Sequence, residues 1–78
     1  MIGKILKKMR LDNNVSQKML ADKLSISQTT LSGWERGYRQ PTFESIEKIA
    51  DFCNYTIAFK NNVNGEIIDS KNINRKDN

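Results

Sequence analysis

The sequence contains no histidine and only one cysteine, Cys53, and these shortages exclude several classes of protein. Without histidine there is no imidazole base for a catalytic triad and no zinc site of the usual kinds, and a lone cysteine cannot form an internal disulfide. The carboxylates of Glu44, Glu47 and Asp51 are better explained as the solvated face of a helix. We therefore expect no enzymatic activity, no metal site and no cofactor.

Long apolar runs are also lacking. No run approaches the roughly 18 residues that a membrane-spanning helix needs, and the residues after Met1 do not form the apolar core of a secretory signal. These features predict a soluble, cytoplasmic protein. At 78 residues, the chain is long enough for one small domain with a modest core.

Acidic residues are scarce in the first half of the chain. Residues 1–40 contain eight Lys or Arg and three Asp or Glu, whereas residues 41–78 contain five and six. The whole chain has a net charge of +4 and a pI near 9.4. The positive charge is therefore concentrated in one half, which favours an anionic ligand for that half.

What the first half does contain is a helix-start pattern that occurs twice, eleven residues apart. In the pattern, a serine directly follows an apolar residue, and a leucine stands five positions after that apolar residue. This spacing is typical of an N-cap serine with a hydrophobic staple between positions N′ and N4. Two helix starts this close leave room for only two helical turns and a bend. The two copies are Val15, Ser16 and Leu20, then Ile26, Ser27 and Leu31.

Four helices are predicted from the spacing of apolar residues, and they cover residues 2–12, 17–24, 28–36 and 43–53. Apolar residues that recur at helical spacing mark the side of each helix that is turned toward the core. These inward residues are Ile2, Ile5, Leu6 and Met9, then Leu20, Ala21 and Leu24, then Leu31 and Trp34, and finally Phe43, Ile46, Ile49, Ala50 and Cys53.

The ends of these helices carry their own signals. Asn13-Asn14 is expected to end the first helix and Gly37 the third, since asparagine and glycine accept the left-handed conformation of a helix end. Thr42 is expected to cap the start of the fourth helix.

The hydrophobic period changes from helical to alternating after residue 54. Tyr55, Ile57 and Phe59 alternate with less apolar residues, and Asn64-Gly65 is a strong signal for a type I′ turn between two strands. The sequence therefore predicts a β-hairpin with strands at about 55–61 and 65–70. The polar residues 71–78 are predicted to be a disordered tail.

Residues 2 to about 54 resemble the helix-turn-helix domain of the phage repressor and Cro family, also called the XRE family. The resemblance implies a mainly α fold, in which a four-helix, lambda-repressor-like DNA-binding domain over residues 1–54 is followed by the β-hairpin at 55–70. The positions that match at the family's spacing are Ser16-Gln17, Leu20-Ala21, the Leu24–Ser27 turn, Leu31, the Trp34–Gly37 run, Pro41 and Ile49-Ala50.

The resemblance implies that the third helix enters the major groove of double-stranded DNA. Base contacts are then expected from Gln28, Thr29 and Ser32, on the polar side of that helix. Gln28 is the best candidate, because its amide can form two hydrogen bonds with adenine. Gly33 stands where several family members carry a long polar side chain, and we expect it to let the helix approach the groove closely.

Phosphate contacts are expected at the starts of the second and third helices, from Gln17 and Ser27, where free backbone N–H groups favour an anion. Arg36, Tyr38 and Arg39 are expected to flank the phosphates on the far side.

Two further positions have expected structural roles. Arg10 matches a first-helix arginine that in many members pairs with the glutamate matched by Glu35, so we expect a buried ion pair between them. Ser25 occupies a turn position where the family usually has glycine, and a left-handed serine there costs roughly 1 kcal/mol.

Members of this family normally bind palindromic sites as two-fold dimers. We expect a transcriptional repressor or autoregulator that forms a homodimer, with Phe52, Ile57 and Phe59 in the interface. A hairpin folded on its own core is the alternative for that segment. For function, the alternative is an antitoxin-like protein that neutralises a toxin and autoregulates its operon.

Overall fold

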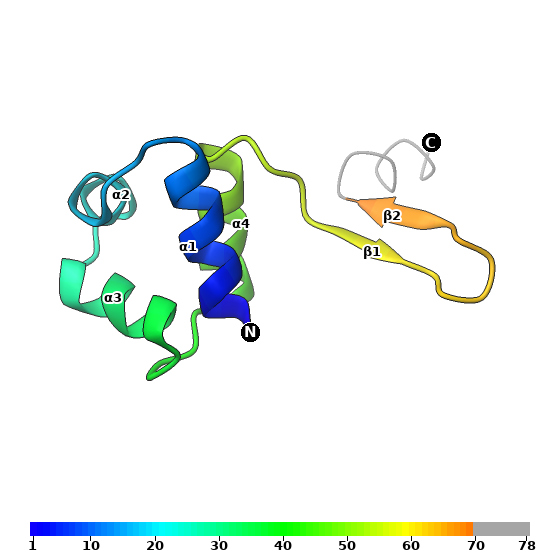
Figure 1. The fold of residues 1–78 in the computed structure, drawn as a ribbon, viewed down its shortest axis with the longest axis horizontal. Helices are drawn as coiled ribbons and strands as arrows, with labels where there is room; N and C mark the ends of the chain where they lie inside the picture. The colour runs from blue at the N-terminus through cyan, green and yellow to red at the C-terminus, as the bar shows by residue number, and fades with distance from the viewer. Residues whose placement is uncertain (70–78) are drawn as a thin grey trace.

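The computed structural model describes residues 1–69, and this part of the chain forms four helices followed by a two-stranded hairpin (Figure 1). This arrangement confirms the predicted fold class. Within these residues no helix is long and apolar enough to cross a membrane. The predicted tail, residues 71–78, lies outside the described residues. The elements are α1 (Ile2–Asp12), α2 (Gln17–Leu24), α3 (Gln28–Arg36), α4 (Phe43–Phe52), β1 (Ala58–Lys60) and β2 (Ile67–Asp69).

Both helix starts predicted from the repeated serine pattern are confirmed. Ser16 Oγ accepts a hydrogen bond from the Met19 N–H at 3.0 Å, and Ser27 Oγ accepts one from the Thr30 N–H at 3.0 Å. Thr42 caps α4 in the same way. Each cap satisfies one of the first N–H groups of its helix, which have no partner within the helix. These bonds fix where α2, α3 and α4 begin.

Left-handed residues close the turns between the helices. Ser25 has a φ of 59° and forms the joint between α2 and α3, and Gly37 has a φ of 86° at the end of α3. Asn14, just beyond α1, has a φ of 57°. The sharp joint at Ser25 confirms that a non-glycine residue adopts the turn conformation usually given to glycine.

The core lies where the four helices meet, with α1 beside α4 and with α2 and α3 packed against them (Figure 1). Most of the predicted inward residues are buried. The prediction is wrong for Ile5 and Phe43, which have 43% and 54% of their surface exposed. A helical stripe gives the direction of a side chain, not whether a neighbouring helix reaches far enough to cover it. The buried apolar residues are Leu6, Met9, Val15, Leu20, Ala21, Leu31, Trp34, Ile49, Ala50 and Cys53.

Gly3 allows α1 to approach the C-terminal end of α3 closely, and this was not predicted from the sequence. A Cβ atom added at Gly3 would lie 2.4 Å from the carbonyl oxygen of Trp34 and 2.6 Å from that of Glu35. These are backbone atoms of α3, so they cannot move without shifting the helix. Glycine is therefore required here by the contact between two helices.

Replacing Gly3 by alanine is expected to lower the free energy of unfolding, because overpacking usually costs about 1–3 kcal/mol and the backbone atoms met here cannot move aside easily. The helix preference of alanine, about 1 kcal/mol better than glycine, offsets part of that cost, so a net loss of up to about 2 kcal/mol is expected. Urea denaturation of Gly3→Ala measures the change. Gly33→Ala is the matched control, because a Cβ atom there meets only the flexible Arg39 side chain, at 3.3 Å. A loss no larger than that of the control would contradict the close contact.

The hairpin forms, but its strands are shorter than predicted and its turn is not of type I′. The register pairs Phe59 with Ile68 and Lys60 with Ile67. A type I′ turn needs positive φ at both central residues. Within residues 1–69, Gly65 has a φ of 80°, whereas Asn64 is not among the residues with positive φ. The strands are therefore joined by a longer loop that follows Asn61.

The segment between α4 and β1 is fastened to the helices before the hairpin begins. The Tyr55 hydroxyl donates to Asp12 Oδ2 at 3.0 Å, and the Tyr55 N–H donates to the Ala50 carbonyl at 2.8 Å. Ile57 is partly buried against the core. Beyond this point the hairpin extends away from the four helices (Figure 1).

Candidate nucleic-acid interface

The third helix turns its apolar residues inward and leaves a polar side outward. Leu31 has no exposed surface and Trp34 is 8% exposed, so these two residues fix the orientation of α3. Gln28 and Thr29 are exposed and Ser32 is half-buried. Gln28 and Thr29 therefore lie on the accessible first turn of α3, and Ser32 lies partly accessible near its middle.

A buried ion pair ties α1 to the C-terminal end of α3, as the resemblance implies. Arg10 Nε donates to Glu35 Oε2 at 2.7 Å, and Arg10 Nη2 donates to Glu35 Oε1 at 2.9 Å. The third donor, Nη1, bonds to the Val15 carbonyl at 2.9 Å. The side chains of Arg10 and Glu35 are 8% and 3% exposed. This two-bonded geometry is the strong form of an arginine–carboxylate pair.

Glu35 remains ionised in spite of its burial. Desolvation alone would raise the pKa of the Glu35 carboxyl, but hydrogen bonds from Arg10 and Gln17, together with the charges of Arg10 and Lys7, hold this pKa below its ordinary value. The hydrogen bonds to Glu35 correspondingly raise the pKa of Arg10. Both groups are therefore charged at neutral pH.

A chain of side-chain hydrogen bonds leads from this ion pair to the exposed end of α3. Gln17 Nε2 donates to Glu35 Oε1 at 3.1 Å, and Gln28 Nε2 donates to Gln17 Oε1 at 3.4 Å. Gln17 was predicted to contact phosphate, and sequence reasoning missed its link to Gln28. The signal was present, because Ser16-Gln17 and Ser27-Gln28 place a glutamine directly after each N-cap.

The other predicted phosphate-contacting residues lie at the two ends of α3. Ser27 uses its Oγ as the N-cap of α3, while Arg36, Tyr38 and Arg39 are exposed. Gly33 is buried because the stem of Arg39 lies over it. A long basic side chain from the loop after α3 therefore lies over Gly33, and the close approach of α3 to the groove at this position remains a prediction.

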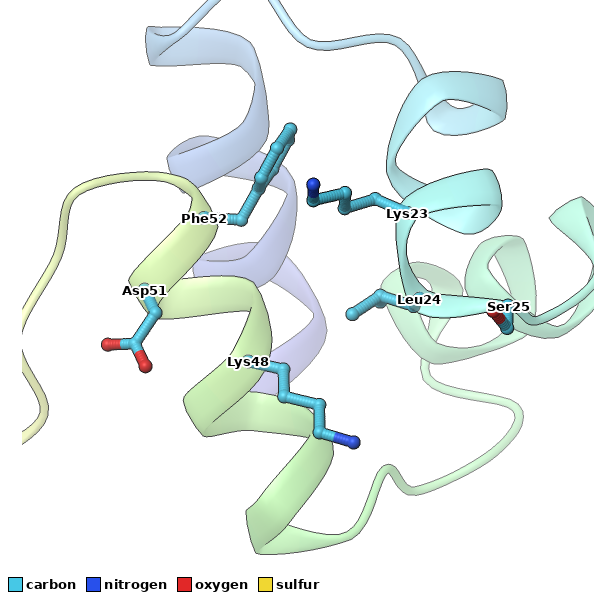
Figure 2. A pocket seen from close by; sticks show the side chains of 6 residues that line it. All are labelled: Lys23, Leu24, Ser25, Lys48, Asp51 and Phe52. Atoms are coloured by element: carbon cyan, nitrogen blue, oxygen red, sulfur yellow. The ribbon is translucent and has the colours of Figure 1, made fainter.

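Phe52, predicted to lie in a dimer interface, is not brought together with the hairpin. Its ring points from α4 toward α2, where Lys23 Nζ lies 5.7 Å from the ring centroid (Figure 2). In Figure 1 the hairpin extends on the opposite side of α4 from α2. Phe52 faces an open groove of about 610 Å³ lined by Lys23, Leu24, Ser25, Lys48, Asp51 and Phe52 itself.

A family model described as helix-turn-helix matches residues 6–60, which is more than half of the chain. The chain belongs to the XRE family of helix-turn-helix proteins. Membership accounts for the serine-capped joint between α2 and α3 and for the outward polar side of α3.

The XRE chain is similar to three bacterial regulators. It is 38% identical over 52 residues to the HTH-type transcriptional activator BcrR of Enterococcus faecalis, covering 67% of this chain and 26% of that protein. It is 38% identical over 58 residues to the HTH-type transcriptional regulator ImmR of Bacillus subtilis (strain 168), covering 74% and 46%. AnsR of the same strain is 37% identical over 51 residues, covering 65% and 44%. The chain thus spans less than half the length of each relative.

A solved structure also resembles this XRE domain. SinR, described as the master regulator for biofilm formation in complex with DNA, superposes with a TM-score of 0.64 at 28% sequence identity. The match covers 70% of this chain and 89% of the SinR chain. The arrangement of the four helices is therefore one that a DNA-bound regulator shares.

Proposed function

We propose that this chain is a transcriptional regulator that binds double-stranded DNA with sequence specificity, through α3 in the major groove. The observation that supports the proposal most strongly is the orientation of α3, with Leu31 and Trp34 buried and Gln28, Thr29 and Ser32 accessible. An accessible helix N-terminus with short and amide side chains fits the major groove, where base edges offer donors and acceptors. SinR, in complex with DNA, shares the fold.

Gln28 is the proposed principal base-reading residue. Its Nε2 carries two N–H groups, so one can bond to Gln17 while the other donates to adenine N7 and Oε1 accepts from adenine N6. Since Gln17 is in turn bonded to buried Glu35, Gln28 is restrained before DNA arrives. Restraint of this kind lowers the entropy cost of binding. Thr29 and Ser32 complete the proposed base contacts.

The proposed phosphate contacts lie on both sides of this reading end. Gln17 and Ser27 stand at the starts of α2 and α3, where unpaired N–H groups and the helix dipole favour a phosphate. Arg36, Tyr38 and Arg39 are exposed on the C-terminal side of α3 and extend the positive surface. These contacts would position the helix without reading sequence.

We further propose that the protein acts as a homodimer on a palindromic operator, as a repressor or autoregulator. A single reading helix contacts few base pairs, and two copies related by two-fold symmetry read two half-sites about 34 Å apart. The hairpin supports the dimer proposal, because an isolated two-stranded hairpin is only marginally stable in water and gains from a second sheet. Phe59 is 62% exposed on this hairpin.

Replacing Gln28 by alanine is expected to weaken binding to the preferred site by about 1–3 kcal/mol and to leave binding to random DNA nearly unchanged. The preferred site is first selected from random double-stranded DNA, and affinities are then measured by fluorescence anisotropy at fixed salt. Asn62→Ala is the control, because it removes an exposed amide in the hairpin loop. An equal loss on both DNAs would contradict base reading by Gln28.

A further inference from the structure

The hairpin carries an exposed apolar pair on one face. Phe59 of β1 lies directly opposite Ile68 of β2, and these side chains are 62% and 40% exposed. Side chains alternate between the two faces of a strand, so Ala58 and Lys60 lie on the other face. The sheet contains only β1 and β2 within residues 1–69. One face of this small sheet is therefore apolar and not covered by the four helices (Figure 1).

The backbone of β1 has a defined open edge. The Asn61 N–H donates to the Glu66 carbonyl at 2.7 Å, so Asn61 directs its backbone polar groups toward the second strand. Backbone direction alternates along an antiparallel strand, so Phe59 also faces β2. The N–H and C=O groups of Ala58 and Lys60 consequently point to the edge of β1 that faces away from β2.

We propose that β1 pairs antiparallel with β1 of a second copy of this chain, about a two-fold axis that passes between the two Phe59 residues. This inference rests on the proposed dimer and specifies its contact. Ala58 of one copy then forms a hydrogen-bonded pair with Lys60 of the other, and each such pair exchanges two backbone hydrogen bonds. The product is one four-stranded sheet in the order β2, β1, β1 and β2.

This register is favoured over its neighbours by charge and by availability. Placing the axis one residue later sets Lys60 opposite Lys60 of the second copy, and like charges directly opposite are destabilising. Placing it one residue earlier sets Phe59 opposite Ile57, which is already packed against the helical core. The register centred on Phe59 uses only the residues of β1 and sets Lys60 opposite Ala58.

The same register explains why the partner is a second copy. At the axis, the two Phe59 residues form a non-hydrogen-bonded pair, the arrangement in which opposite side chains lie closest, with Cα atoms about 4.5 Å apart. The face then carries an unbroken row of Ile68, Phe59, Phe59 and Ile68 across four strands. Four strands with an apolar face have the independent stability that a lone hairpin lacks. The strand thus complements itself in backbone hydrogen bonds and apolar surface, and the register sets no like charges directly opposite each other.

A charge-swap experiment tests the register. Phe59→Lys and Phe59→Glu each place like charges together on the axis, so each variant alone is expected to be a monomer by sedimentation equilibrium. An equal mixture of the two variants is expected to form a heterodimer, because opposite charges then meet. Circular dichroism checks that both variants keep the helical melting temperature of the unchanged chain. A dimer in either single variant, or monomers in the mixture, would overturn the proposal.

Cross-linking gives a second test that does not depend on charge. Phe59→Cys is expected to form a disulfide-linked dimer in air, since the expected Cα separation lies within the range for a disulfide. Val63→Cys is the control, because the loop tips of the two copies would lie at opposite ends of the sheet. The native Cys53 is 1% exposed and does not compete. Equal cross-linking of both variants would overturn the register. Failure of the unchanged chain to bind a single DNA half-site would instead count against the proposed function, whatever the cross-linking shows.

Discussion

Replacing Glu35 by alanine is expected to lower the free energy of unfolding by about 3–5 kcal/mol. The substitution leaves the Arg10 guanidinium in the core, 7% exposed, with only the Val15 carbonyl as a partner. A buried charge without its counter-charge loses the attraction that offsets its desolvation. Since small domains are stable by only about 5–15 kcal/mol in total, much of the variant should unfold at moderate urea concentrations. Urea denaturation followed by Trp34 fluorescence measures the loss.

The chain provides a matched control in its exposed ion pair. Lys8 and Asp12 are 3.0 Å apart, but their side chains are 74% and 43% exposed. Lys8→Ala is expected to change the free energy of unfolding far less than Glu35→Ala does, because solvent screens this exposed pair. The double variant Arg10→Met, Glu35→Leu should recover most of the lost stability, because it removes both buried charges. Equal losses for Glu35→Ala and Lys8→Ala would contradict a buried, coupled pair.

The ion pair also makes stability depend on acid pH. The pKa of Glu35 in the folded protein lies below its ordinary value of 4.5. The ionised carboxylate therefore makes its full contribution to the free energy of unfolding at pH values above 4.5. The contribution is lost as pH falls through the lower, folded pKa. Urea denaturation from pH 6 downward should therefore show a decline below about pH 4.5 that is smaller in the Arg10→Met, Glu35→Leu variant. The exposed Asp12, whose pKa is also lowered, contributes equally to both proteins.

The helix boundaries were predictable because their causes are local. Ser16, Ser27 and Thr42 cap helices through bonds to N–H groups three residues ahead, so sequence and structure carry the same information. The orientation of α3 was predictable for the same reason, since Leu31 and Trp34 are separated by one helical turn. The base-contact candidates follow from that orientation, and their roles toward DNA remain predictions.

The contacts between elements were harder to predict because they depend on distances across the fold. Gly3 is required by carbonyl groups more than thirty residues away, and its helix gives no local reason for glycine. The hydrogen bond that Gln28 donates to Gln17 depends on the angle set by Ser25 at the joint. The placement of Arg39 over Gly33 arises in the same way, from a loop that returns to its own helix.

The hairpin loop shows how one side chain can override a strong local signal. Asn61 Oδ1 accepts hydrogen bonds from the N–H groups of Val63 and Asn64, at 2.8 Å and 3.4 Å. Asparagine bonds of this kind compete with tight turns by offering the backbone another partner. Asn64 in turn accepts from the Glu66 N–H at 2.9 Å, so only Gly65 adopts positive φ here. The Asn64-Gly65 pair therefore forms the end of a longer loop.

Breaking the proposed dimer is expected to have the largest effect on DNA affinity. Phe59→Lys and Phe59→Glu should each weaken binding to a palindromic site by about 10²–10⁴-fold, because joining two reading domains makes the second binding event intramolecular. Binding to one half-site should be little changed. The plot of log affinity against log salt should also become about half as steep, since a monomer contacts about half as many phosphates. Fluorescence anisotropy on both DNAs across a salt series measures all three quantities.

Two variants at the tip of the hairpin separate this effect from a simple change of charge. Val63→Lys and Val63→Glu make the same charge changes on a residue that is 96% exposed and lies outside both strands. Long-range attraction to DNA would strengthen binding for each lysine variant and weaken it for each glutamate variant. Loss of the dimer would weaken palindrome binding for both Phe59 variants and for neither Val63 variant. Opposite effects from the two Phe59 charges would show that only attraction had changed, and the hairpin would then have no part in pairing the two reading helices.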